Sequence, residues 1–186
     1  MDQVLVQQCQ RFNREAQRAF YDYAYGKTMA LCLRYSKNQE QANEMFAQGF
    51  LKLCLAIGEL KKSQDIDAWM HRKMVDHAVG FLRERRQEYF ITSTVRLNGE
   101  DVMPEFDLFH QQLEPDESTL TTEEYLKALQ ALPPSFRAAY NMQVIDGFSE
   151  EEVSKSLELS TETCKYNLSK AKEIFYKNLT HIQNPC

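Results

Sequence analysis

The chain lacks long apolar runs and is poor in the residues that break helices. No stretch of its 186 residues is apolar enough to span a bilayer, and its first residues do not follow the pattern of a secretion signal. Only six glycines and five prolines occur, whereas 43% of the residues are hydrophobic and 26% are charged. This composition predicts one or two small, helix-rich domains that do not insert into a membrane.

The five cysteines show no spacing typical of a metal site or of a disulfide framework. Their number is odd, they are scattered, and neither a CxxC pair nor a Cys/His ligand spacing occurs. Reduced cysteines in a cytoplasm are the simplest interpretation of this pattern. We therefore expect a cytoplasmic protein that binds no metal and no other cofactor.

Positive charge is missing from one segment near the middle of the chain. Between Arg96 and Lys127 there is no lysine or arginine, whereas nine acidic residues fall there. The segment also contains turn-forming residues and has no sustained apolar period, which predicts an acidic, partly flexible linker over 91–121. The linker would join a helical domain at 7–90 to another at 122–182. The net charge of −5 is therefore concentrated between the two domains.

The C-terminal domain is predicted to hold two short helices separated by a tight turn. A helix begins near Pro133 and Pro134, which can start a helix but not continue one. Ser149 and Glu152 have the spacing of a capping box, and Ser160 can cap the next helix. Two short capped helices, the second of them cationic, are typical of a helix-turn-helix that reads a DNA major groove.

The second helix of this pair is the candidate recognition helix. Its apolar residues recur at helical spacing and leave a polar, cationic side. Glu158 occupies the turn position where glycine is usual, and an L-residue adopts that geometry only at some cost. An αα-hairpin with a solvated lysine face explains the segment as well on these residues alone. The candidate DNA contacts are Ser160, Thr161, Glu162, Lys165, Tyr166, Asn167, Lys170 and Lys172.

The N-terminal domain is predicted to consist of helices with apolar faces. One helix runs over 39–57, and we expect Leu55 and its other apolar residues to point mostly inward. A further helix, over 68–86, carries several arginines and lysines beside the single tryptophan, Trp69. Trp69 is either a core anchor or a platform on which a base stacks.

Three segments of the chain together carry one family pattern. They are QANEMFAQGFLKL at 41–53, DAWMHRKMVDHAVGFLRERR at 67–86 and ALPPSFRAAYNMQVIDGFSEEEVSKSLELSTETCKYNLSKAKEIF at 131–175. Arg137 and Gly147 match the pattern within the last segment. In this order the segments resemble the extracytoplasmic-function sigma factors, the smallest two-domain class of the sigma-70 family of bacterial transcription initiation factors.

The resemblance implies a non-enzymatic, all-α protein that selects promoters for RNA polymerase. Its two small helical domains would be a sigma region 2-like bundle and a sigma region 4-like helix-turn-helix, joined by the acidic linker. The implied partners are the core RNA polymerase, through the clamp helices of its largest subunit and its flap, and promoter DNA in double-stranded and melted form. An anti-sigma factor is a further implied partner.

The resemblance also assigns contacts to two helices of the N-terminal domain. Core polymerase would be bound by Asn43, Glu44, Gln48 and Lys52. The −10 element would be held by Trp69, His71, Arg72, Lys73, Asp76, Arg83, Arg85 and Arg86. The cationic residues among them suit phosphate contacts, which supply affinity but little sequence information. A solvated polar helix face explains the four core-binding positions equally well.

A sigma-like interaction protein that has kept the fold but lost promoter recognition is the first alternative. It is favoured by Glu158, Ala47-Gln48 and Asp76, where the family pattern has other residues, and by the net acidity of the chain. The recognition helix also carries only lysines, which lack the bidentate fork of arginine.

A helical metal-dependent hydrolase is the second alternative, suggested by His71 and the pair Asp76-His77. The two histidines are six residues apart, about 240° around a helix, so they do not share a face. We expect both to be ordinary exposed histidines.

Overall fold

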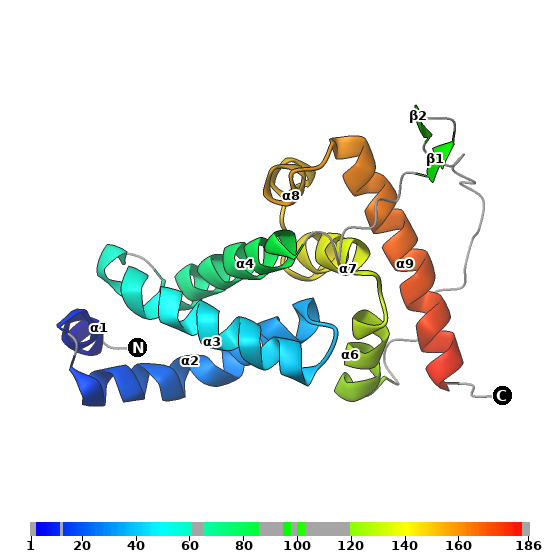
Figure 1. Ribbon diagram of the computed structural model, residues 1–186. Coiled ribbons are helices and arrows are strands. Elements are labelled where there is room, and N and C mark those ends of the chain that lie inside the picture. The colour runs from blue at the N-terminus through cyan, green and yellow to red at the C-terminus, as the bar shows by residue number, and fades with distance from the viewer. Residues whose placement is uncertain are drawn as a thin grey trace. The chain divides into compact units, whose positions relative to one another are not determined.

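The computed structural model describes residues 3–11, 13–60, 65–85, 95–97, 100–102 and 120–183. These residues form helices, apart from one short two-stranded ribbon, and the predicted all-α class is confirmed (Figure 1). The chain divides into two compact units, residues 1–81 and 82–186. No helix in the described part of the chain combines the length and the apolar character needed to cross a membrane.

The first unit is built from helices that start at asparagine caps. Its elements are α1 (Gln3–Gln10), α2 (Arg14–Tyr35), α3 (Gln39–Ala56), the 3-10 turn η1 (Ile57–Glu59) and α4, which begins in this unit (Ile66–Glu84). Asn13 accepts a hydrogen bond from the Ala16 amide at 3.0 Å, and Asn38 accepts one from the Gln41 amide at 3.0 Å. Each cap satisfies an amide that the first turn leaves without a partner, and so fixes where α2 and α3 begin.

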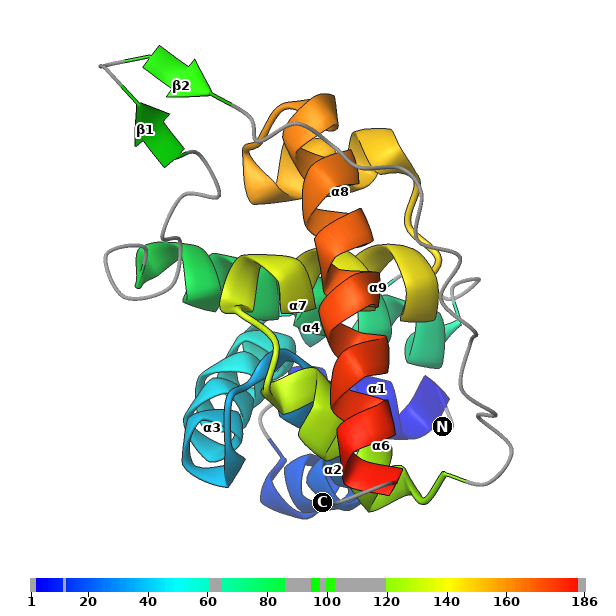
Figure 2. The same cartoon turned by 90° about the vertical axis from the view of Figure 1, so that its right-hand side faces the viewer.

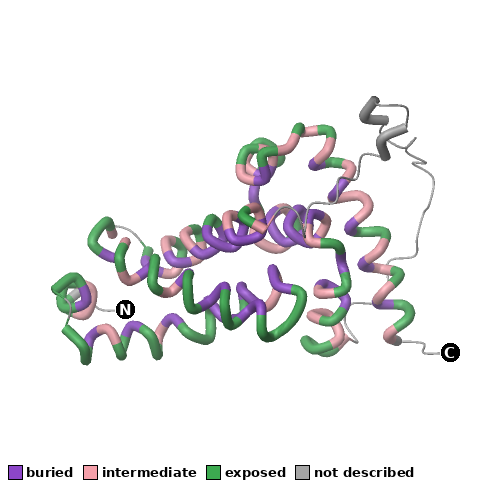
Figure 3. The backbone as a smooth tube through the Cα atoms, viewed as in Figure 1, coloured by how far each residue is buried: buried purple, intermediate pink, exposed green. Residues whose placement is uncertain are grey.

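Apolar side chains of α2, α3 and α4 are buried in this unit. Phe20, Leu53 and Met74 are among its buried side chains, and Figure 3 shows buried stretches recurring along these helices. Gly49 permits the close approach of α3 to α4, because a Cβ atom there would lie 2.6 Å from Cδ2 of His77. The expectation for Leu55 was wrong: its side chain is 69% exposed. Two residues after the buried Leu53, it lies about 200° around the helix.

The second unit packs its helices around the long C-terminal helix. Its elements are α6 (Thr122–Gln130), α7 (Pro134–Tyr140), the π-helical segment η3 (Asn141–Ile145), α8 (Glu150–Leu157) and α9 (Thr161–Gln183). α9 lies against α6, α7 and α8, and Figure 2 shows its run beside α6 and α7. Leu129, Tyr140 and Phe175 lie in the shared core. The predicted start at Pro134 is confirmed, and Gly147 ends the segment with a φ of +72°.

Arg137 holds the end of α6 against α7. Its side chain is only 1% exposed, and one guanidinium nitrogen donates to the carbonyl oxygens of Gln130 at 2.7 Å and Leu132 at 3.1 Å. The last carbonyl groups of a helix have no partner within the helix, and a cation there also meets the negative end of the helix dipole. Arg137 thus closes the α6 C-terminus.

A short antiparallel ribbon lies within the segment predicted to be a linker. Its strands are β1 (Val95–Leu97) and β2 (Glu100–Val102), with Val95 opposite Val102. Sequence reasoning expected an extended segment here and did not foresee the ribbon. Residues 91–94 and 103–119 lie outside the described residues, and the limits 7–90, 91–121 and 122–182 stay predictions.

Candidate functional site

The helix-turn-helix consists of α8, a tight turn and the first turns of α9. Both predicted caps are confirmed: Ser149 and Glu152 form a reciprocal capping box, and the Ser160 hydroxyl accepts from the Thr163 amide at 3.1 Å. Glu158 ends α8 in the left-handed conformation, with φ 54° and ψ 44°. An L-residue adopts this conformation at a cost of roughly 1–2 kcal/mol, so the surrounding hydrogen bonds must hold it.

Ser154 takes part in three of those hydrogen bonds. Its hydroxyl donates to the Leu159 carbonyl oxygen at 2.6 Å, and its own carbonyl oxygen accepts from the Leu159 amide at 3.1 Å. The Glu158 amide donates to the same Ser154 carbonyl oxygen. The turn is therefore fixed by local bonds, and it sets the direction in which α9 begins.

The predicted DNA contacts on α9 differ in their exposure. Ser160, Glu162, Lys165 and Lys172 are exposed, whereas Thr161, Tyr166 and Lys170 are half-buried. Asn167 does not belong with them, because its side chain is only 1% exposed. It lies three residues after Cys164 and four before Ala171, on the buried stripe of α9. The prediction of a DNA contact by Asn167 is therefore wrong.

Acidic partners reduce the positive charge of this helix face. The Lys165 ammonium lies 3.4 Å from a carboxylate oxygen of Glu150, the first residue of α8. The Lys170 ammonium lies 2.6 Å from the Glu173 carboxylate, and this hydrogen bond raises the pKa of Lys170. Sequence reasoning missed both pairs. The spacing of Lys170 and Glu173 could have indicated the second pair, but the first joins two helices.

The N-terminus of α9 already carries a carboxylate. The pKa of Glu162 is lowered, first by a hydrogen bond from its own backbone amide and then by one from the Ser160 hydroxyl. A helix N-terminus with free amides also attracts phosphate groups. A DNA phosphate that approaches this end of α9 therefore competes with the Glu162 side chain.

The outer surface of α3 brings together the four predicted core-binding residues. Asn43, Glu44, Gln48 and Lys52 are all exposed, and the Gln48 amide donates to the Glu44 carboxylate at 3.3 Å. Two leucines that sequence reasoning did not assign to this face extend it toward the end of the helix. We define the α3 face as these six residues: Asn43, Glu44, Gln48, Leu51, Lys52 and Leu55.

The two leucines are unusual because they are large, apolar and exposed. Leu51 is 61% exposed and Leu55 is 69% exposed, one helical turn apart. A cluster of aromatic rings lies on another side of α3, where Tyr21 and Tyr25 of α2 meet Phe46 at centroid distances of 5.8 and 5.2 Å. Apolar groups gathered on an exposed surface are typical of interaction sites.

The predicted −10 contacts are spread along α4. Arg72 and Asp76 are exposed, whereas Trp69, His71 and Lys73 are half-buried. Arg83 is in the last turn, Arg85 follows it, and Arg86 lies outside the described residues. The Lys73 ammonium donates to the Glu59 carboxylate at 3.0 Å, and Arg72 lies 3.9 Å from Asp76.

His77 contradicts the expectation of an exposed histidine. Its side chain is 6% exposed, with Nε2 3.0 Å from the Met45 carbonyl oxygen and Nδ1 3.1 Å from the Lys52 ammonium. Both ring nitrogens are therefore engaged within the protein. The described residues contain no group of three or more His, Cys, Asp or Glu side chains that could hold a metal ion. The arrangement of His77 counts against the hydrolase hypothesis.

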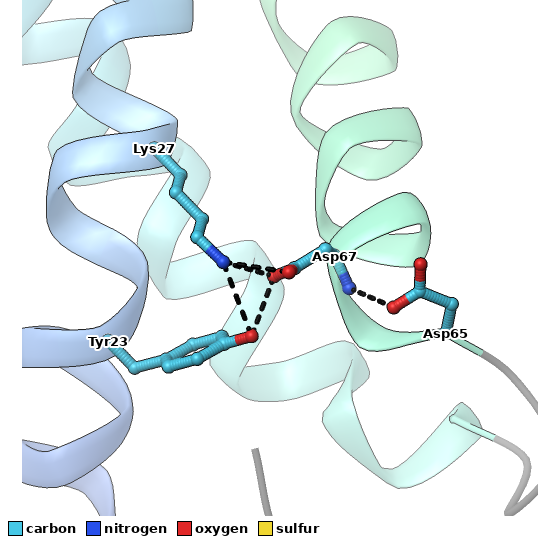
Figure 4. Close-up of polar contacts among 4 residues, drawn as sticks. All are labelled: Tyr23, Lys27, Asp65 and Asp67. Carbon is cyan, nitrogen blue, oxygen red and sulfur yellow. Dashed lines mark hydrogen bonds and ion pairs between the residues drawn. The ribbon is translucent and has the colours of Figure 1, made fainter.

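A polar clamp fixes the first turn of α4 to α2, as Figure 4 shows. The two Asp67 carboxylate oxygens accept hydrogen bonds from Lys27 at 2.7 and 2.8 Å, and one of them accepts from the Tyr23 hydroxyl at 2.8 Å. Asp65 accepts from the Asp67 amide at 3.0 Å. The hydrogen bond from Lys27 is the main cause that lowers the pKa of Asp67, and it likewise raises the pKa of Lys27. Sequence reasoning missed this clamp.

The clamp predicts a specific pH dependence of stability. Because the folded-state pKa of Asp67 lies below its unfolded value, its contribution is complete above the unfolded pKa of about 3.9 and is lost as pH falls through the folded pKa. Asp67→Asn should lower Tm modestly at pH 7, and the difference from wild type should shrink below about pH 4. Thermal unfolding followed by circular dichroism from pH 7 to pH 3 measures this. Lys27→Met is the matched variant, and a difference as large at pH 3 as at pH 7 would contradict the assignment.

Comparisons with known proteins agree with these features. Residues 122–174 match the family model described as sigma-70, region 4. The chain is 21% identical over 183 residues to the RNA polymerase sigma-H factor of Pseudomonas aeruginosa, covering 96% of this chain and 93% of that protein. It is 20% identical over 187 residues to the ECF RNA polymerase sigma factor SigW of Bacillus subtilis, covering 95% and 96%.

One solved structure has the same fold. It is the sigma factor RpoE in complex with the anti-sigma factor NepR from Bartonella quintana, with a TM-score of 0.51 and 17% identity. The match covers 88% of this chain and 96% of that chain. The capped helix-turn-helix lies in the part of the chain that matches sigma-70, region 4. The region 4 match and the sigma-factor relatives support the resemblance of this chain to the extracytoplasmic-function sigma factors of the sigma-70 family.

Proposed function

We propose that this protein binds core RNA polymerase and directs promoter-specific transcription initiation, by recognising −10 and −35 elements. The helix-turn-helix is the main support for this proposal, because α8 and the capped first turns of α9 lie within the sigma-70 region 4 match at 122–174. The protein acts in the cytoplasm, where its relatives' polymerase is found, and it acts as a binding factor rather than an enzyme. An anti-sigma factor like the one that binds RpoE is a further partner.

The −35 element is read by the first turns of α9. The N-terminal residues of a recognition helix reach base edges in the major groove. Thr161, Glu162 and Lys165 occupy these positions, with Tyr166 at their border because its ring packs edge-on against Phe136. Ser160 and the helix amides face a phosphate, and Lys170 and Lys172 add phosphate contacts further along.

The −10 element is held along α4. Arg72, Lys73, Arg83, Arg85 and Arg86 supply phosphate contacts, and Trp69 and His71 receive an unstacked base. Asp76 completes the set of proposed −10 contacts as a further polar residue on this helix. The clamp on Asp67 fixes the beginning of this helix, two residues before Trp69, and so keeps the base-receiving end in place.

Core polymerase docks on the α3 face. Stable protein interfaces have an apolar centre and a polar rim. Leu51 and Leu55 provide the apolar part, and Asn43, Glu44 and Gln48 lie along the same helix as the polar part. The polymerase clamp helices are the surface that this face would meet.

Removing the apolar part of the α3 face tests this docking surface. The double variant Leu51→Ser with Leu55→Ser should bind core polymerase at least about tenfold more weakly, because full burial of each leucine contributes about 1.5–3 kcal/mol. Fluorescence anisotropy with labelled protein and purified core measures the affinity. Val144→Ser is the matched control, since Val144 is 45% exposed in the other unit. Equal affinities of both variants would rule out this surface.

The proposed function as a whole is tested in two steps. Purified protein is first incubated with core polymerase from its own host and analysed by pull-down. Run-off transcription is then performed on genomic promoter fragments with core and with core plus this protein. Promoter-dependent transcripts that require the protein are the expected result. Core binding without any transcript would favour the interaction-protein hypothesis, and absence of core binding would overturn the proposal.

A further inference from the structure

His77 joins the two functional helices of the first unit. Its Nε2 lies 3.0 Å from the Met45 carbonyl oxygen of α3, and its Nδ1 lies 3.1 Å from the Lys52 ammonium of the same helix. A carbonyl oxygen can only accept, so Nε2 carries the ring proton and donates it. Nδ1 of the neutral ring then accepts a hydrogen bond from Lys52. The His77 side chain of α4 thus contacts α3 through both of its ring nitrogen atoms.

The ring is held in a close-fitting position. Its Cδ2 atom lies against α3 at Gly49, where an added Cβ would come within 2.6 Å of the ring. Phe81 of α4 meets the ring edge-on, with centroids 6.1 Å apart. The imidazole is only 6% exposed. The position of Nδ1 is therefore fixed by the packing of α3 against α4.

Lys52 differs from the His77 ring in its exposure to solvent. Its side chain is exposed and lies on the α3 face, where a lysine in solution samples many rotamers. The hydrogen bond to Nδ1 draws the ammonium toward one place. Two of its three protons stay available for a partner, because an ammonium has three donors and His77 uses one.

We propose that His77 is a positioning residue, which holds the Lys52 ammonium in the orientation in which it meets an acceptor group on core polymerase. The inference rests on the proposed function, because it needs the α3 face to be the docking surface. The hydrogen bond between His77 and Lys52 also couples α4, the proposed −10 helix, to polymerase binding. A movement of α4 moves Nδ1 of His77, and the Lys52 ammonium moves with it.

The energetic effect follows from the rotamer freedom that binding would otherwise remove. Immobilising a long side chain at an interface weakens binding by a factor of about three to ten. Loss of the Nδ1 acceptor should therefore weaken core binding by that factor, provided that Lys52 is present. If His77 served only to stabilise the core, its replacement would lower stability. The effect on core binding would then not depend on the presence of Lys52.

Two substitutions separate the two ring nitrogens. His77→Gln places an amide nitrogen near the position of Nε2, so it keeps a donor for the Met45 carbonyl oxygen and removes the acceptor for Lys52. His77→Asn places an amide oxygen near Nδ1 and keeps an acceptor for Lys52. His77→Gln should weaken core binding about three- to tenfold, and His77→Asn should retain more of the wild-type affinity.

A double-mutant cycle provides the decisive measurement. Core affinity is measured for wild type, His77→Gln, Lys52→Ala and the double variant, with thermal unfolding to compare their stability. The expected result is that His77→Gln weakens binding in the presence of Lys52 but not in the Lys52→Ala background. An equal loss in both backgrounds, or no effect of Lys52→Ala, would overturn the inference while wild type still binds. Failure of wild type to bind core would instead overturn the proposed function, and this inference with it.

A spectroscopic measurement keeps the test independent of how well the variants fold. Nitrogen-15 NMR of the free wild-type protein should show His77 protonated on Nε2 and unprotonated on Nδ1. Lys52→Ala, a change at an exposed residue, should shift the Nδ1 resonance. A ring protonated on Nδ1, or a resonance that ignores Lys52→Ala, would overturn the inference.

Discussion

Replacing Arg137 with methionine is expected to lower the free energy of unfolding of the second unit by about 3 kcal/mol. Hydrogen bonds from a charged donor contribute about 1.5–3 kcal/mol each, and Arg137 donates two, to Gln130 and Leu132. The methionine side chain fills part of the space and recovers some apolar burial. The carbonyl groups at the end of α6 would then be buried without that donor.

Urea unfolding followed by circular dichroism measures this loss. Lys177→Met is the matched control, because it removes one cation from an exposed position of the same unit. Arg137→Lys should give an intermediate loss, since a single ammonium does not reproduce the geometry of the guanidinium fork. A variant Arg137→Met as stable as Lys177→Met would show that the buried guanidinium does not hold α6 and α7 together.

The local start and stop signals of the helices could be predicted from the sequence. The capping box of Ser149 and Glu152 and the cap at Ser160 involve residues three positions apart, so their geometry follows from the helix itself. Glu158 was expected to fit the turn only at some cost, because glycine is usual there, and it adopts the left-handed conformation. These signals locate the helix-turn-helix, and with it the candidate recognition helix.

Features that depend on packing between helices could not be predicted in this way. His77 was expected to be exposed, but the absence of a side chain at Gly49 lets α3 approach α4 and buries the ring. Asn167 was assigned to the DNA face because it is polar, although its spacing from Cys164 places it on the buried stripe. Polarity therefore gave a poorer prediction of exposure than helical spacing did.

In the candidate site, too, some features follow from helical spacing and others depend on how two helices pack. Helical spacing was enough to gather Glu44, Gln48 and Lys52 on one exposed surface, because they lie four residues apart. The pairing of Lys165 with Glu150 could not be predicted, since it needs the angle between α8 and α9. That pairing changes the expected strength of DNA binding, because the lysine has an anionic partner before any phosphate arrives.

Removing two lysines of α9 should have the largest effect on −35 binding. Each lysine–phosphate contact contributes about 0.9 to the slope of log affinity against log salt, which corresponds to roughly eightfold in affinity at 0.1 M salt. Lys170→Gln with Lys172→Gln should therefore weaken binding to a −35 duplex by up to about sixtyfold and lower the slope by about two. Anisotropy titrations between 50 and 200 mM salt measure both quantities.

Glu150→Gln tests whether the ion pair with Lys165 restrains this binding. The Lys165 ammonium must leave the Glu150 carboxylate, 3.4 Å away, before it reaches a base edge, and the carboxylate itself repels the DNA backbone. The variant should bind the duplex more tightly than wild type, and most of the gain should vanish in the Lys165→Gln background. Lys177→Gln controls for net charge, because Lys177 is exposed but lies beyond the first turns of α9. If Lys177→Gln weakened binding as much as Lys165→Gln, the effect would be one of overall charge, and the recognition helix would not be the surface that meets DNA.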